Sequence, residues 1–123
     1  MINKSILHAC HTEGFKEDEL YDAYKIFFGT LVSESRLRII NLLQKGKKNV
    51  GELVSELAMD QTAVSHDLAR LKQCGFVRAT REGKFMYYSL NQDIRALMHL
   101  IEKHMGKYCI HILHTMNGTE ARQ

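Results

Sequence analysis

Two short helical patterns joined by a tight turn dominate the middle of this 123-residue chain. Asn49 and Glu52 have the spacing of a capping box that begins the first helix, over residues 50–57. After a turn at residues 59–60, Asp60 is suited to cap a second helix that runs to Gln73. The second helix has one apolar face, formed by Val64, Leu68 and Leu71. This pair of helices predicts a helix-turn-helix.

A β-hairpin is predicted directly after the second short helix. The stretches FVRATR and KFMYYSL are rich in β-branched and aromatic residues, which favour strands. They are separated by Glu82-Gly83, and glycine accepts the positive φ that a tight hairpin turn requires. A hairpin that follows a helix-turn-helix predicts a wing, and therefore a winged helix-turn-helix.

Helices are also predicted on both sides of this unit. Apolar periodicity marks helices over residues 17–29, 34–45 and 91–115. The expected fold is mainly α with a β-hairpin wing, in the order of four helices, two strands and one helix. We expect an N-terminal arm at residues 1–15, one domain at 16–115 and a tail at 116–123. The absence of proline, repeats and a long polar linker argues against a second domain.

Length and composition indicate where this protein is found and whether it forms a dimer. A chain this short buries only about two-thirds of its unfolded surface, which favours a dimer that extends the core. Its apolar stretches are far below the roughly 20 residues that span a bilayer, and its N-terminus lacks a signal-peptide pattern. Three cysteines form no disulfide framework. We therefore expect a cytoplasmic protein with reduced thiols and no membrane partner.

The second short helix is predicted to enter the major groove of double-stranded DNA. Its polar face carries small or hydrogen-bonding side chains suited to base edges and phosphates. Arginine and lysine beside this face and on the hairpin suit backbone phosphates, although the net charge of +3 alone decides nothing. The predicted DNA contacts are Gln61, Thr62, Ser65, His66, Ala69, Arg70, Gln73, Arg81 and Lys84.

Three segments together resemble the ArsR/SmtB family of winged-helix repressors. They are RLRIINLL, VGELVSELAMDQTAVSHDLARLKQCGFV and REGKFMYYSL, which cover about half of the chain. The resemblance implies a homodimer joined by the first and last helices. It also implies repression from a palindromic operator, with release by a metal ion or another inducer.

The resemblance implies two types of metal site. The thiolate type would fall on Asn49, Val50 and Gly51, which lack sulfur, so that site is absent. The type on the last helix would fall on Asn91, Asp93, His104 and Lys107, of which only Asp93 and His104 suit a metal. These two residues are about 16 Å apart along one helix, so an antiparallel partner helix would be needed to bring them together.

Further candidate ligands lie close to the two ends of the chain. Imidazole and thiolate groups favour zinc, nickel, cobalt or copper(I) over magnesium and calcium. His111 and His114 are spaced i, i+3, close enough to bind one ion. The candidate set on the last helix is Asp93, His104, Cys109, His111 and His114, and the candidates in the arm are His8, Cys10 and His11.

The leading interpretation is a metal-responsive transcriptional repressor, and three alternatives are open. One is a thiol-responsive repressor in which Cys10 and Cys109 pair on oxidation. Another is a repressor without small-molecule input, controlled by abundance or a protein partner. The third is an enzyme such as a zinc hydrolase. Because the sequence has no HExxH, nucleophile elbow, P-loop or dinucleotide fingerprint, we do not expect catalysis.

Overall fold

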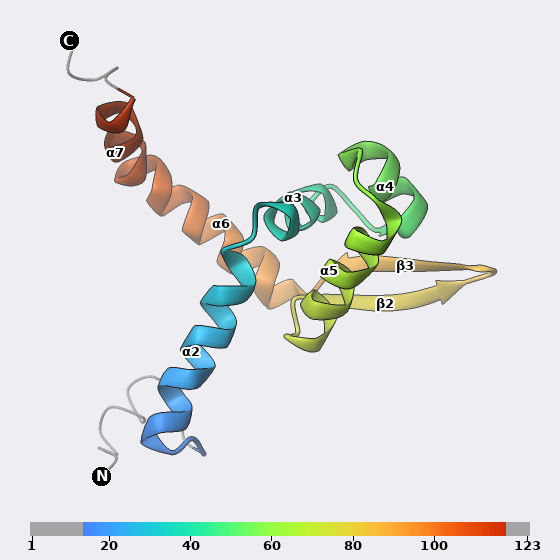
Figure 1. Cartoon of the computed structure of the whole chain (residues 1–123), viewed down its shortest axis with the longest axis horizontal. Helices are drawn as coiled ribbons and strands as arrows, with labels where there is room; N and C mark the ends of the chain where they lie inside the picture. Colours follow the sequence, from blue (N-terminus) through green and yellow to red (C-terminus); the bar gives the residue numbers. More distant parts are fainter. Residues whose placement is uncertain (1–13, 118–123) are drawn as a thin grey trace.

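The computed structural model describes residues 14–117. It has the predicted order of elements, with one additional strand and with the last helix divided in two (Figure 1). The elements are α2 (Glu17–Leu31), α3 (Glu34–Leu43), β1 (Lys48–Asn49), α4 (Val50–Leu57), α5 (Gln61–Gln73), β2 (Val77–Glu82), β3 (Phe85–Leu90), α6 (Gln92–Lys107) and α7 (Cys109–Met116). The mainly α fold with a hairpin wing is confirmed.

The hydrophobic core lies where α3, α4, α5 and the start of α6 meet the sheet. The predicted apolar face of α5 is buried, and Val64 and Leu71 are fully inaccessible. Phe76 is also fully buried, and its ring centre lies 5.2 Å from that of Phe27 on α2. The remaining core side chains are Ile39, Ile40, Leu43, Leu53, Leu68, Val77, Leu90, Ile94 and Met98.

Both helices of the helix-turn-helix begin with a side-chain cap. The Asn49 side chain accepts a hydrogen bond from the Glu52 amide, and the Asn49 amide donates to the Glu52 carboxylate, both at 2.9 Å. Helix α4 ends at Ala58, which has a left-handed φ of 52°. The Asp60 carboxylate then accepts from the Ala63 amide at 3.2 Å and begins α5. Local capping therefore fixes where α4 begins and where α5 begins after the turn.

The wing is an antiparallel hairpin in which Val77 lies opposite Leu90 and Glu82 opposite Phe85. Gly83 has a φ of 63°, as its turn position requires. The two-residue strand β1 pairs with the other side of β3, so the sheet order is β1-β3-β2. Such a short strand has no sequence period of its own, which explains why the pattern analysis missed it.

The prediction of a single last helix over residues 91–115 is wrong in one respect. The structure interrupts it at Tyr108, where φ is −120°, between α6 and α7. Gly106, a poor helix former, lies two residues before the break. Helices α2 and α6–α7 extend away from the body in different directions (Figure 1). Within residues 14–117, no helix is long and apolar enough to cross a membrane.

The capping box gives a first testable prediction. Asn49→Ala removes the acceptor for the Glu52 amide, so we expect it to lower the free energy of unfolding by about 1 kcal/mol. Urea unfolding of purified protein measures this change. Ser55→Ala, at an exposed position inside α4, is the matched control and should not destabilise. An unfolding midpoint of Asn49→Ala equal to that of Ser55→Ala would contradict the role of the cap.

Candidate nucleic-acid interface

Helix α5 presents a continuous polar face to solvent. The buried face of the helix holds it against the core, so the opposite side remains accessible. That side has no acid in its first turn. Five of the predicted DNA contacts are exposed on it: Gln61, Thr62, Ser65, His66 and Ala69. An exposed helix face of small and hydrogen-bonding residues is suited to a DNA groove.

The wing adds positive charge beside this helix. Arg81 and Lys84 are exposed at the tip, and the Lys84 ammonium lies 5.6 Å from the centre of the Phe85 ring. The neighbouring acid, Glu82, forms an ion pair with Lys47. Within the described part of the chain, Arg81 and Lys84 make no ion pair. Their charges are therefore available to an external anion such as a phosphate.

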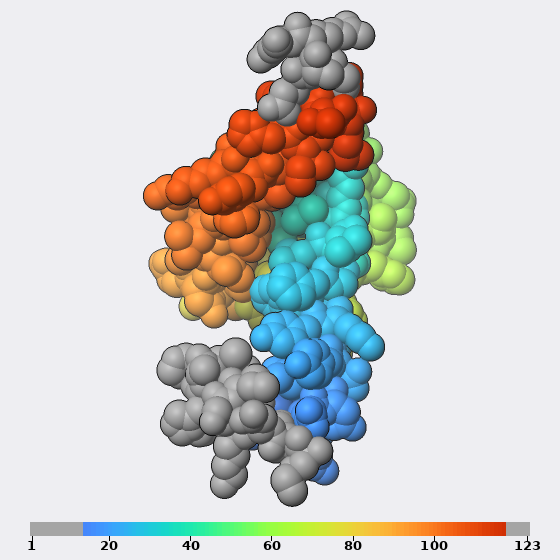
Figure 2. Space-filling model, turned by 90° about the vertical axis from the view of Figure 1, so that its left-hand side faces the viewer, coloured from blue at the N-terminus to red at the C-terminus, as the bar shows by residue number. Residues whose placement is uncertain are grey.

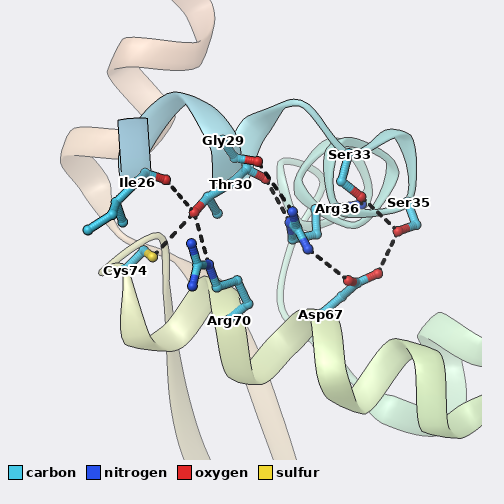
Figure 3. A network of polar contacts seen from close by, with 9 residues as sticks. All are labelled: Ile26, Gly29, Thr30, Ser33, Ser35, Arg36, Asp67, Arg70 and Cys74. Atoms are coloured by element: carbon cyan, nitrogen blue, oxygen red, sulfur yellow. Dashed lines mark hydrogen bonds and ion pairs between the residues drawn. The ribbon is translucent and has the colours of Figure 1, made fainter. Parts of the chain in front are cut away.

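A buried hydroxyl connects α2 to the end of α5 (Figure 3). Thr30 is fully buried, and its hydroxyl donates to the Ile26 carbonyl at 2.7 Å. The same oxygen accepts from Nε of Arg70 at 3.2 Å and lies 3.4 Å from the Cys74 sulfur. One side chain of α2 therefore contacts the last turn of α5 and its C-cap.

Arg36 connects the other end of this contact region to the middle of α5. Its Nε donates to the Thr30 carbonyl at 2.7 Å, and a terminal nitrogen donates to the Gly29 carbonyl at 3.3 Å. The other terminal nitrogen lies 3.4 Å from Asp67, whose second oxygen accepts from the Ser35 hydroxyl at 2.6 Å. Because Asp67 is the only acid on α5, this pairing also compensates negative charge beside the exposed polar face of the helix.

One of the predicted DNA contacts, Arg70, lies toward a different side of α5, whereas the exposed Gln73 shares the polar face with His66 and Ala69. Arg70 is directed toward Thr30, and together with Gln73 it lines a pocket against α2. Sequence reasoning did not identify the roles of Thr30 and Arg36. Their partners on α5 are 31 to 40 residues away, and local periodicity carries no signal for contacts at that separation.

The predicted metal ligands are spread along the last two helices. Asp93 lies in the first turn of α6 and His104 in its last turn, with the His104 ring 4.7 Å from that of Tyr108. The other candidates, Cys109, His111 and His114, are on α7, and the Cys109 thiol is exposed.

The structure does not bring these candidates together within one chain. Among residues 14–117, no three histidine, cysteine, aspartate or glutamate side chains are grouped as a metal site. The arm candidates His8, Cys10 and His11 lie outside the described residues. A complete coordination sphere from this set therefore requires the arm or a second chain.

Comparison with known proteins identifies the family. The model for "Bacterial regulatory protein, arsR family" matches residues 33–79. The regulator Rv0081 of Mycobacterium tuberculosis is 33% identical over 94 residues, covering 75% of this chain and 82% of that protein. A Streptomyces lividans protein named "Probable mercury resistance operon repressor" is 34% identical over 64 residues, covering 52% of this chain and 51% of the relative.

Solved structures have the same fold. The crystal structure of Rv0081 has a TM-score of 0.71 and 32% identity, covering 76% of this chain and 96% of that one. The homodimeric winged helix-turn-helix domain Mb0332 of Mycobacterium bovis also reaches 0.71, at 28% identity over 80% and 94% of the two chains. Reduced HlyU from Vibrio cholerae reaches 0.61, at 28% identity over 75% and 95%.

These relatives confirm the resemblance found in the sequence. They are DNA-binding transcriptional regulators, which agrees with the expectation that the protein is not an enzyme. The matched residues 33–79 include α3, the helix-turn-helix and the first residues of the wing. The chain belongs to the ArsR family of winged helix-turn-helix transcriptional regulators.

Proposed function

We propose that this regulator is a homodimeric repressor that binds a palindromic operator and is released by a transition-metal ion. The observation that carries the DNA-binding part is the exposed face of α5, where the only acid of the helix is engaged by Arg36 and Ser35. A two-fold dimer presents two such helices, which suits a palindromic operator whose half-sites lie one helical turn apart.

The proposed groove contacts are the exposed residues at the start and middle of α5. Thr62, Ser65 and His66 form hydrogen bonds to base edges or phosphates, and Gln61 lies at the helix N-terminus, which favours a phosphate. Ala69 permits close approach to the groove. Arg81 and Lys84 on the wing neutralise flanking phosphates. Arg70 is not part of this proposed set, because its Nε donates to Thr30 of α2. Gln73, the last residue of α5, shares the polar face and also lines the pocket against α2.

The proposed dimer interface uses the two helices that extend from the body. Figure 2 views the side of the molecule where α2 and α6–α7 both lie at the surface. Large apolar side chains on these helices remain accessible in one chain: Tyr21, Tyr24, Phe28, Leu100, Met105, Tyr108, Ile112, Leu113 and Met116. Apolar side chains exposed in such numbers favour burial against a second copy. The relative Mb0332, which is described as homodimeric, supports a homodimer.

The proposed metal site combines residues from two chains. An antiparallel pair of α6 helices would place Asp93 of one chain near His104 of the other, with Cys109, His111 and His114 as further donors. These groups suit zinc, nickel, cobalt or copper(I). The relative named for mercury resistance supports a metal as the inducer. To release DNA, the ion must bind the low-affinity conformation more tightly.

The proposed DNA contacts predict different effects for two substitutions. His66→Ala removes a groove-facing side chain, so we expect operator affinity to fall more than affinity for random DNA. Lys84→Ala removes a phosphate contact, so affinity for both DNAs should fall. The slope of log affinity against log salt concentration should decrease by about one. Fluorescence anisotropy over a salt series measures both effects. Equal losses on both DNAs from both variants would contradict these roles.

The metal part of the proposal predicts a change in operator affinity. One stoichiometric ion of zinc, nickel or copper(I) should weaken binding about tenfold or more, a coupling of at least about 1.4 kcal/mol. His104→Ala should remove this response, whereas His99→Ala, at an exposed position of α6 outside the proposed set, should retain it. A wild-type affinity that is unchanged by all three ions would show that the inducer is not one of these metals.

A second candidate is a thiol-responsive repressor. The exposed Cys109 thiol favours it, and a related solved structure is described as reduced HlyU. In this scheme a peroxide oxidises Cys109 and Cys10, the two thiols lose their protons and form a disulfide, and the peroxide is reduced to alcohol and water. Cys10 lies outside the described residues.

Thiol counting and DNA binding test this candidate together. Peroxide should remove two thiols for each disulfide formed and lower operator affinity, and Cys109→Ser should abolish both effects. Cys74→Ser is the matched control, because Cys74 is partly buried beside Thr30 and has no role in this scheme. Operator affinity that is the same before and after oxidation would exclude the thiol switch.

A further inference from the structure

A pocket of about 360 Å³ lies between α2 and the C-terminal half of α5. This volume is within the range of small-molecule sites, which is about 300–1,000 Å³. Helix α2 contributes an apolar wall and α5 contributes the polar groups. The lining residues are Ala23, Ile26, Phe27, Arg70, Gln73 and Cys74. An apolar wall that faces a cation is suited to a ligand with an apolar body and a negative charge.

Arg70 has donors available to such a ligand. Its Nε is used by the Thr30 hydroxyl, but its two terminal nitrogens make no hydrogen bond or ion pair within the described residues 14–117. The carboxylate on the preceding turn, Asp67, is engaged by Arg36 and Ser35 instead, as Figure 3 shows. The guanidinium therefore faces the pocket without a carboxylate partner.

The pocket is distinct from the proposed dimer surface. On α2, Ala23, Ile26 and Phe27 face α5 together with the buried Thr30. The exposed aromatic side chains of α2, which are Tyr21, Tyr24 and Phe28, lie roughly 140° around the helix from that side. Ile26, which is 52% exposed, opens on the pocket side of α2 and not on the side of these three aromatic residues.

We propose that this pocket binds a small organic carboxylate with an apolar body. The carboxylate pairs with the free terminal nitrogens of Arg70, a geometry for which guanidinium is suited. The apolar body contacts Ile26 and Phe27, and the Gln73 amide provides a further donor at the rim. Because the same Arg70 joins Thr30 of α2 to α5, the ligand engages a contact between the dimerisation helix and the DNA-facing helix.

Calorimetric titration of the full chain without DNA or metal tests the proposal. The probe is 3-phenylpropionate, and the matched neutral compound is 3-phenylpropionamide. We expect saturable binding of one carboxylate per chain and about tenfold weaker binding of the amide, because the amide lacks the charge that pairs with Arg70. Absence of carboxylate binding, or equal affinity for the two compounds, would overturn the proposal.

Three variants locate the binding. Arg70→Met should abolish carboxylate binding, whereas Lys72→Met removes an exposed cation of the same helical turn outside the pocket and should retain it. Ala23→Leu narrows the pocket and leaves the Thr30 contacts intact, so it should also abolish carboxylate binding. This variant tests the pocket even if Arg70→Met does not fold. Retained affinity in folded Arg70→Met or in Ala23→Leu would show that the ligand binds elsewhere. None of these measurements depends on the proposed operator or metal site.

Discussion

The orientation of α5 depends on the polar contacts that join it to α2 and α3. Arg36 binds carbonyls at the end of α2 and the carboxylate of Asp67, and the side chains of this ion pair are only 22% and 14% exposed. Each hydrogen bond contributes on the order of 1 kcal/mol net, but loss of one partner leaves a partly buried charge unpaired, which costs more. The contacts therefore specify one arrangement of the three helices in addition to stabilising it.

The same contacts explain how one short helix is both fixed and accessible. The apolar face of α5 packs on the core through Val64, Leu68 and Leu71, and this packing sets the distance of the helix from the core. Rotation of α5 about its axis and sliding along the core must be opposed by other contacts. Asp67 and Arg70 provide that resistance on the side toward α2 and α3. On the remaining side, residues such as Ser65 and His66 are exposed, so they are accessible for the DNA contacts proposed above.

The sequence predicted what depends on neighbouring residues and missed what depends on distant ones. The caps at Asn49 and Asp60 and the turn at Gly83 are local, so their residue types identified them. The break at Tyr108 and the direction of Arg70 were not predicted, because the first depends on weak local propensity and the second on Thr30, forty residues away. The exposed polar face of α5 was predicted by helical periodicity. Of the metal candidates, Asp93 and His104 were taken from the family resemblance and the others from their residue types, and neither determines whether side chains converge in one chain.

An effector can alter DNA binding only if it distinguishes two arrangements of the protein. In this fold the helices proposed to join two chains, α2 and α6–α7, differ from the helix proposed to contact DNA. Contacts of α2 with α5 run through Thr30 and Arg36, so a displacement of α2 changes the partners of Arg70 and Asp67. A ligand beside Arg70 would act on this contact directly, whereas an ion at α6–α7 would have to act through α2, which lies beside Leu97 of α6. That convergence follows from the position of Thr30, the one polar side chain in residues 14–117 that is fully buried where α2 meets α5.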